Sequence, residues 1–387
     1  MKRKTGTYTV STTLGEQVKA FVPLPLPPVN PSIEPNHYAD LNQKAELAIA
    51  RLNGVSALVL SVDWFLYSAV RKEALLTSQI EGTQATLVDL LDDESGFGVL
   101  NTDDVEEVTN YIQAYRWVQG QLRDPAGLPL SVRLLCESHH RLMSGVRGSD
   151  KHPGQLRRSQ NWIGGTRPGN AVFVPAPPEQ VVELMSNLEK FIHADSDQSD
   201  NLPPLVKIAL IHAQFETIHP FLDGNGRIGR LLITALLEHW GLMPQPLLYL
   251  SSYLKRHQSA YYRHLSAIRN DGDWEAWISF FLEGVITAAT DAHKNITAIS
   301  TLFAQDRKRL LDATHVTPSS YRLFEQLPLM PRFSIEQVRH QLQTSFPTAT
   351  AAIKILESLG IVKELTGHKK NRYYSYQAYV DLMADDT

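Results

Sequence analysis

The sequence predicts a mainly α-helical protein, and three observations support this fold class. Apolar residues recur at helical spacing over long stretches such as 40–53, 62–81 and 103–122. Strand-like patterns are confined to 172–174 and 361–376, and the second of these alternates like a hairpin. Breaker residues divide the region before that hairpin into three short helical segments. We therefore expect a helical core with a short β-hairpin, followed by a smaller C-terminal module.

The expected elements follow one another along the chain. Residues 22–36 are rich in proline, so we expect an extended arm that lies over the surface. Residues 92–98 are expected to form a loop. The expected helices are 40–53, 62–81, 103–122, 131–145, 178–194, 203–218, 228–239 and 273–313, and then 321–327, 335–342 and 348–359.

The composition is that of a globular protein without a targeting signal. The chain has 387 residues, of which 43% are hydrophobic and 20% charged, enough for two or three domains. Its net charge of −4 gives no general reason to expect nucleic-acid binding. The single cysteine, Cys136, excludes an internal disulfide and fits a reducing compartment. Because no apolar signal core or membrane-spanning run is found, we expect a cytoplasmic protein with no membrane partner.

One stretch concentrates residues suited to chemistry: 219–230 reads HPFLDGNGRIGR and joins two predicted helices. Arg227 and Arg230 fall in or near the first turn of the second helix, where a cation is unfavourable by roughly 0.3–1 kcal/mol. Arginines are reasonable there if an anion binds, and Gly224 and Gly226 allow the backbone to approach it closely. The stretch therefore predicts a phosphate cradle.

Each of these residues also has an ordinary structural explanation. The glycines alone would indicate a turn, Asp223 a helix N-cap, and His219 a buried, hydrogen-bonded histidine. Their occurrence together favours chemistry, because His219 can accept a proton from an attacking hydroxyl and Asp223 can hold Mg²⁺ against phosphate oxygens. The stretch contains no serine or cysteine nucleophile, so we expect transfer of a phosphoryl or nucleotidyl group to an outside acceptor.

The stretch matches every fixed position of the Fic family signature, H-P-F-x-[D/E]-G-N-G-R-x-x-R, and the resemblance extends over about residues 60–290. It implies a protein adenylyltransferase that transfers AMP from ATP to Ser, Thr or Tyr hydroxyls of target proteins, self-modification included. It also implies that His219 is the general base, that Asp223 binds Mg²⁺ and that Arg230 holds the γ-phosphate. The implied ATP-binding residues are Glu81, His219, Gly224, Asn225, Gly226 (the last three as anion hole), Arg227, Ile228, Gly229, Arg230 and Asn270.

A second match lies upstream, where residues 77–82 read TSQIEG and resemble the inhibitory motif of the family. Thr77 and Glu81 are four residues apart and share a helical face, and Gly82 resembles a helix C-cap. A carboxylate in the last turn of a helix needs a cation nearby, and the resemblance supplies Arg230. We expect Glu81 to compete with the γ-phosphate, although this hexapeptide by itself would indicate a solvated glutamate.

Two weaker features border the expected site. Val172, Phe173 and Val174 form a short extended piece that resembles the family's flap, which docks the target by strand addition. The alternative is a surface hairpin that packs an aromatic residue. Asn270, near the end of a helix, is our expected nucleotide contact, and the upstream Arg157 can be explained as a solvated charge.

The C-terminal region has the element order of a winged helix: three helices and a hairpin. Eight Lys or Arg against seven Asp or Glu over residues 316–387 give a net charge of only +1. Docking of DNA and docking of a protein partner therefore stay open as alternatives. The expected division is 1–115 (N-terminal helical region with the inhibitory helix near 62–82), 116–290 (catalytic core), 291–315 (helical linker) and 316–387 (winged helix).

The first hypothesis for function is thus an autoinhibited adenylyltransferase that uses ATP and Mg²⁺. The alternative is a DNA-binding regulator in which the core senses nucleotide, and phosphoryl transfer is a third hypothesis. Nothing in the sequence decides whether the protein forms a homodimer.

Overall fold

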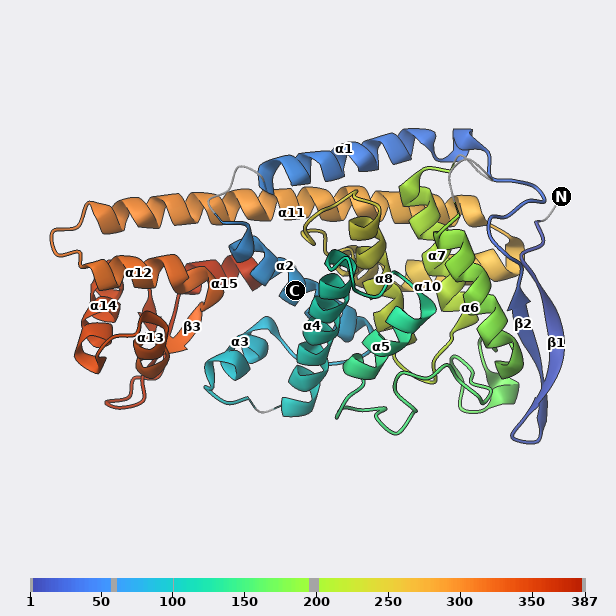
Figure 1. Cartoon of the computed structure of the whole chain (residues 1–387), viewed down its shortest axis with the longest axis horizontal. Helices are drawn as coiled ribbons and strands as arrows, with labels where there is room; N and C mark the ends of the chain where they lie inside the picture. Colours follow the sequence, from blue (N-terminus) through green and yellow to red (C-terminus); the bar gives the residue numbers. More distant parts are fainter. Residues whose placement is uncertain (1–2, 57–60, 100, 195–201, 385–387) are drawn as a thin grey trace.

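The structure, a computed structural model, describes residues 3–56, 61–99, 101–194 and 202–384. The molecule is elongated, and the 38-residue helix α11 (Trp274–Leu311) runs along most of its length (Figure 1). Helix α1 (Ala39–Ser56) packs along α11. The predicted mainly α-helical fold is confirmed. None of the helices in the described part of the chain combines the length and apolar character needed to span a membrane.

The core surrounds two helices that are buried on almost every side. All residues of α7 (Pro204–Ile218) from Leu205 onward are buried except Lys207, as is most of α8 (Asn225–His239). A helix that is apolar all round belongs in the centre of a domain, and this explains the position of the pair. The helices that enclose or adjoin it are α2 (Val62–Ile80), α4 (Thr102–Arg123), α5 (Val132–Leu142), α6 (Pro178–Ile192), α9 (Ser251–Arg256) and α10 (Gln258–Asp271).

The chain begins with an antiparallel hairpin, and the expectation of strands in only two places is therefore wrong. Strands β1 (Gly6–Thr13) and β2 (Glu16–Pro23) pair along their whole length. Both turn residues between them have positive φ, 50° at Leu14 and 80° at Gly15, which suits the twist of a tight hairpin. Alternating Thr, Tyr and Val residues were the available signal, since β-branched and aromatic residues favour strands.

A second correction concerns residues 92–98, which do not form only a loop. Helix α3 (Leu87–Ser95) includes the first part of this stretch. It begins at a capping box, in which Thr86 and Asp89 satisfy each other's backbone N–H groups, and it ends at Gly96 with φ 70°. Such a box supports a short helix, and Leu87, Leu90 and Leu91 bury its apolar face.

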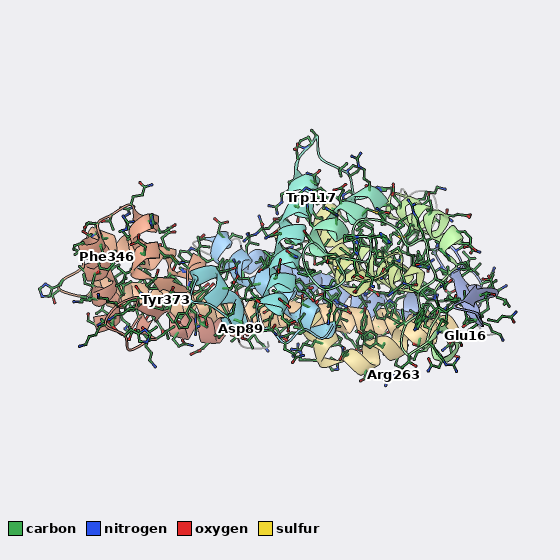
Figure 2. The ribbon with its side chains drawn as sticks, turned by 90° about the horizontal axis from the view of Figure 1, so that it is seen from below. Glu16, Asp89, Trp117, Arg263, Phe346 and Tyr373 are labelled. Carbon is green, nitrogen blue, oxygen red and sulfur yellow. The ribbon has the colours of Figure 1, made fainter. Side chains whose placement is uncertain are left out.

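The C-terminal module combines short helices with a three-stranded antiparallel sheet, and it forms one end of the molecule (Figure 2). The strand order is β3-β5-β4. The last helix, which no sequence pattern predicted, packs against α11. The elements are α12 (Pro318–Gln326), β3 (Arg332–Ser334), α13 (Ile335–Leu342), α14 (Phe346–Ser358), β4 (Lys363–Glu364), β5 (Tyr373–Ser375) and α15 (Gln377–Ala384).

This module docks on α3 and on the first turn of α2. Arg332 of β3 forms an ion pair with Asp92 of α3, and both side chains are almost buried, at 11% and 12% exposure. The Tyr373 hydroxyl donates to the Gly96 carbonyl at 2.9 Å, and the Tyr379 hydroxyl donates to the Trp64 carbonyl at 3.3 Å. The module is thus attached to the core by polar contacts in addition to α11.

Replacing Arg332 by leucine should lower the free energy of unfolding by about 3 kcal/mol, because the buried Asp92 carboxylate loses its partner. Urea unfolding measures the loss. The control is Arg339→Leu, which removes a more exposed ion pair with Glu336 on α13 and should cost at most about 1 kcal/mol. Equal losses in the two variants would contradict a stabilising role for the Arg332 contact.

Candidate active site

The 219–230 stretch forms a rigid loop between α7 and α8. His219 ends α7 in the left-handed region, with φ 52° and ψ 61°, and Gly224 precedes α8 with φ 74°. The Asn225 side chain closes the loop, because its Oδ1 accepts from the Phe221 N–H and its Nδ2 donates to the Phe221 carbonyl, both at 2.8 Å. The predicted loop between two helices is therefore present, and Asn225 stabilises the loop from within.

His219 has the protonation state that a base requires. Burial lowers the pKa of its imidazole to about 4, and the nearby charge of Arg157 contributes in the same direction. The ring is therefore neutral at pH 7 and free to accept a proton. Its side chain lines the same pocket as Glu81 and Arg230.

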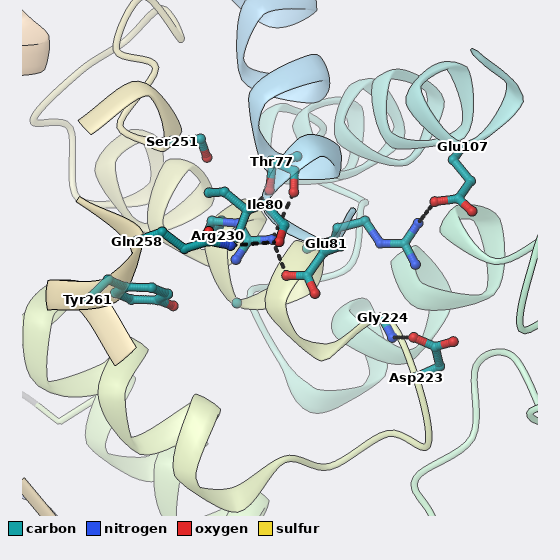
Figure 3. A network of polar contacts seen from close by, with 12 residues as sticks. Thr77, Ile80, Glu81, Glu107, Asp223, Gly224, Arg230, Ser251, Gln258 and Tyr261 are labelled. Carbon is teal, nitrogen blue, oxygen red and sulfur yellow. Dashed lines mark hydrogen bonds and ion pairs between the residues drawn. The ribbon is translucent and has the colours of Figure 1, made fainter. Parts of the chain in front are cut away.

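Glu81 and Arg230 form the ion pair that the sequence analysis expected. Glu81 Oε1 lies 2.5 Å from Arg230 Nη2, and the side chains are 31% and 1% exposed respectively (Figure 3). Thr77 adds two acceptors for the same guanidinium, its Oγ1 at 2.5 Å from Nε and its carbonyl at 3.0 Å from Nη2. Within the described part of the chain, residues of the 77–82 motif therefore accept the hydrogen bonds of the Arg230 side chain.

The Glu81 carboxylate also lies against the start of α8, where the cradle for an anion was expected. A Cβ atom at Gly226 would lie only 2.1 Å from Glu81 Oε1, so only glycine allows this approach. Burial alone would raise the pKa of Glu81, but the Arg230 guanidinium outweighs it and holds that pKa below its ordinary value. The α8 N-terminus is thus occupied by a negative charge of the protein itself.

Asp223 is suited to a magnesium ion. Its Oδ1 accepts from the Gly224 N–H at 2.6 Å, and the residue is partly exposed. Mg²⁺ is usually held by one or two carboxylates together with substrate phosphates rather than by a full protein cage. A single carboxylate next to the cradle fits this pattern. In the described ranges, no group of three or more His, Cys, Asp or Glu side chains could enclose a metal ion.

Arg227 has a different environment from the one expected for a phosphate contact. It is buried, and its Nη1 lies 3.1 Å from Glu107 Oε2 on α4. Its Nη2 lies 3.5 Å from Met143 Sδ. The structure therefore pairs Arg227 with a carboxylate, whereas Ile228 and Gly229 are buried in the first turns of α8.

A pocket of about 340 Å³ opens beside these residues. The expected flap residues Val172 and Phe173 line one side of it, and α10 lines another. Asn270 is exposed and is not among the lining residues, whereas its neighbour Arg269 is. The pocket is lined by Glu81, Ile163, Gly164, Val172, Phe173, Glu216, His219, Gly226, Arg230, Tyr261, Tyr262, Leu265, Ser266 and Arg269.

The flap is a narrow hairpin rather than a regular sheet. The Ile163 N–H donates to the Phe173 carbonyl at 2.8 Å, and the Phe173 N–H donates back to the Ile163 carbonyl at 3.1 Å. On its other side, the Val174 carbonyl accepts from the Phe21 N–H of β2 at 2.9 Å. Val172 is 78% exposed, and the Arg269 guanidinium lies 3.9 Å above the Phe173 ring.

Several residues that complete the site were not singled out from the sequence. One is Glu107, which pairs with Arg227. Another is Glu216 at the pocket wall, whose pKa is raised by burial to about 7. His139 of α5 bridges the 219–230 loop and the segment before the flap, since its Nδ1 accepts from the Gly154 N–H at 2.8 Å while its Nε2 lies 3.0 Å from the Asp223 carbonyl. The signal for His139 was its position on the apolar face of an amphipathic helix.

Comparison with known proteins identifies the family. Residues 129–237 match the Fic/DOC family, and residues 39–119 match the N-terminal region of Fic/DOC family proteins. The "Protein adenylyltransferase Fic" of Drosophila grimshawi is 28% identical over 207 residues, which cover 53% of this chain and 39% of the relative. The protein of the same name from Drosophila melanogaster is 27% identical over 207 residues. The chain thus spans about two fifths of the length of these curated relatives.

Solved structures share the fold. A Fic family protein from Desulfovibrio desulfuricans G20 superposes with a TM-score of 0.57 at 21% identity, covering 89% of this chain and 96% of that one. Fic-1 of C. elegans (residues 134–508) gives a TM-score of 0.51 at 20% identity, covering 68% of this chain and 74% of that one. At these identities the likeness concerns the fold alone.

Replacing His139 by glutamine should change how stability depends on pH. Burial lowers the pKa of His139 from its ordinary 6.5 to about 4. Between these values the unfolded chain binds a proton that the folded protein does not, so the stability contributed by the neutral ring is lost as pH falls from 6.5 towards 4. In His139→Gln, the free energy of unfolding, measured with urea at several pH values in this window, should depend less steeply on pH than in the native protein. The difference in slope should be up to about 1.4 kcal/mol per pH unit. The prediction would be contradicted if the plot of unfolding free energy against pH stayed parallel to that of the native protein. The control is His140→Gln, at an exposed neighbouring position.

Proposed function

We propose that this chain, which belongs to the Fic/DOC family, is a protein adenylyltransferase that transfers AMP from ATP to a side-chain hydroxyl of a target protein. The observation that carries the proposal is the arrangement at the start of α8. There a carboxylate of the protein fills an anion cradle beside a half-buried histidine that is neutral at pH 7. The names of the curated relatives support the same reaction class.

In the proposed reaction the target hydroxyl oxygen attacks the α-phosphorus of ATP. The new O–P bond forms as the bond between the α-phosphorus and the bridging oxygen breaks, and pyrophosphate leaves. His219 takes the hydroxyl proton, and the N–H groups at the start of α8 stabilise the negative charge on the α-phosphate. Mg²⁺, held by Asp223, would supply charge neutralisation for the phosphates.

We also propose that Glu81 restrains this reaction. The Glu81 carboxylate pairs with Arg230, the cation that the γ-phosphate needs. Arg230 cannot pair fully with both anions at once. ATP then binds only after Glu81 moves away, and its apparent affinity falls in proportion to the fraction of protein in which Glu81 is displaced. Thr77, which bonds the same guanidinium, keeps Arg230 oriented toward α2.

Replacing Glu81 by glycine should increase transfer of label from α-phosphate-labelled ATP to protein by about tenfold or more, equivalent to at least about 1.4 kcal/mol. The reason is that Arg230 and the α8 N-terminus become available to phosphates. In Glu81→Gly combined with His219→Ala, ATP should still bind but labelling should disappear. Unchanged ATP affinity and labelling in Glu81→Gly would refute the inhibition, and label from the γ-phosphate would indicate phosphoryl transfer instead.

The C-terminal module supports a second candidate, a DNA-binding regulator in which the core senses nucleotide. Its element order, α12-β3-α13-α14-β4-β5, supports a winged helix. The loop between β4 and β5 exposes His368, Lys369 and Lys370. Helix α14, however, exposes Phe346 at its start and carries a single cation, Lys354, which leaves a protein partner as the alternative.

If the module binds DNA, the native protein should retard duplex DNA at low salt, and Lys369→Glu with Lys370→Glu should abolish the retardation. Each lost phosphate contact should reduce the slope of log affinity against log salt by about 1. The control is Lys294→Glu, at an exposed position on α11. Absence of retardation by the native protein would rule out this candidate.

A further inference from the structure

Arg157 is a buried arginine whose environment differs sharply from that of the next residue. Arg157 is 3% exposed, whereas Arg158 is exposed. The expectation that Arg157 is a solvated charge is therefore wrong. Burial lowers the pKa of Arg157 to about 10, although the group remains a cation at neutral pH. A buried cation is costly unless hydrogen-bond acceptors surround it, so the acceptors of Arg157 determine whether its position is stable.

The acceptors are main-chain carbonyl groups from two separate segments. Nε donates to the His219 carbonyl at 2.9 Å, and Nη2 donates to the carbonyl of Ile218 at 3.3 Å. The same Nη2 donates to the carbonyl of Ala176 at 2.5 Å. In addition, the Arg157 N–H donates to the Pro220 carbonyl at 2.9 Å. One residue thus joins the end of α7 to the chain that leaves the flap.

The contacts at the end of α7 fix the backbone that carries the base. The last carbonyl groups of a helix have no partner within the helix, and a cation near them is favourable. His219 itself is left-handed, a conformation that costs a residue other than glycine roughly 1–2 kcal/mol. By bonding the carbonyl groups of Ile218 and His219, Arg157 stabilises this turn and so determines where the imidazole lies.

The contact at Ala176 fixes the other half of the site. Ala176 is fully buried and lies two residues after Val174, the last of the flap residues. The flap is otherwise held by hydrogen bonds with Ile163 and Phe21 and by Gln160, which donates to the Pro175 carbonyl at 2.9 Å. None of these bonds joins it directly to α7, so the bond at Ala176 links its position to the end of α7.

We propose that Arg157 is a positioning residue that holds His219 and the flap in one frame, so that a hydroxyl presented at the flap meets the imidazole. The inference rests on the proposed function of His219 as the base. It adds a residue to that function which touches neither nucleotide nor target and acts through the backbone. Lysine keeps the charge but cannot donate to carbonyl groups in two directions from one planar group.

The kinetic test uses the Glu81→Gly protein as background, with Arg157→Lys as the variant and Arg158→Lys as the matched control. We expect kcat for AMP transfer to fall by about 10- to 100-fold in Arg157→Lys, because a displacement of about 1 Å at the reacting groups has that effect. KM for ATP should stay within about twofold, since Arg157 bonds none of the residues at the start of α8, where the phosphates are proposed to bind. A fall in kcat no larger than in Arg158→Lys, or a rise in KM that accounts for the loss, would overturn the proposal.

Amide hydrogen exchange provides a readout that does not depend on activity. In Arg157→Lys, exchange should become faster in both 171–176 and 215–221, while 261–271 in α10 should keep its native rates. Faster exchange in only one of the two segments, or throughout the chain, would show that Arg157 does not couple them.

Arg157→Ala with millimolar guanidinium chloride should recover part of the lost kcat, whereas the same salt should leave the Arg158→Lys protein unchanged.

The two proposals fail in distinguishable ways. If Glu81→Gly with native Arg157 transfers no AMP, the proposed function fails, and the exchange experiment still decides whether Arg157 couples the flap to the His219 turn. If transfer occurs and Arg157→Lys affects neither kcat nor exchange, only the positioning role fails.

Discussion

The ion pair between Glu81 and Arg230 is the constraint around which the site is organised. A carboxylate at the end of α2 is unfavourable with respect to the dipole of its own helix, but it lies at the favourable, N-terminal end of α8. This requires the end of α2 to be held in place, and neighbouring side chains hold it. Gln258 donates to the Ile80 carbonyl at 3.0 Å (Figure 3). Lys255 donates to the Gln79 side chain at 2.5 Å.

Much of the fold and of the site could be predicted because the relevant signals are local. Thr77 and Glu81 lie one helical turn apart, so a partner for one could be expected to meet the other, and Arg230 contacts both. The loop between α7 and α8 was predictable because apolar periodicity marks a helix on each side of it. Residues close in sequence determine the loop and the shared face of Thr77 and Glu81, whereas their partner Arg230, 149 residues from Glu81, was expected only from the family resemblance.

Other features depend on contacts between distant segments, which no local pattern encodes. Arg157 and Arg158 are adjacent and chemically identical, yet only the packing of α7 against the flap decides which of them is buried. Arg227 was expected to face phosphates, but its partner Glu107 comes from α4, 120 residues away in the chain. Arg269 lines the pocket and Asn270 faces the solvent, because successive residues point to different sides of a helix and the packing of α10 decides which side meets the pocket.

The C-terminal module shares its apolar core with the last turns of α11. Residues 291–311, within the segment predicted as a linker, bury Ile296, Ile299 and Phe303, and the Phe303 ring lies 5.0 Å from that of Phe324 in the module. A chain truncated after α11 would uncover the face of Phe303 that Phe324, Tyr376 and Tyr379 cover. Removing the module to isolate the core would therefore be expected to yield an insoluble or self-associating fragment unless Phe303 were also replaced by a polar residue.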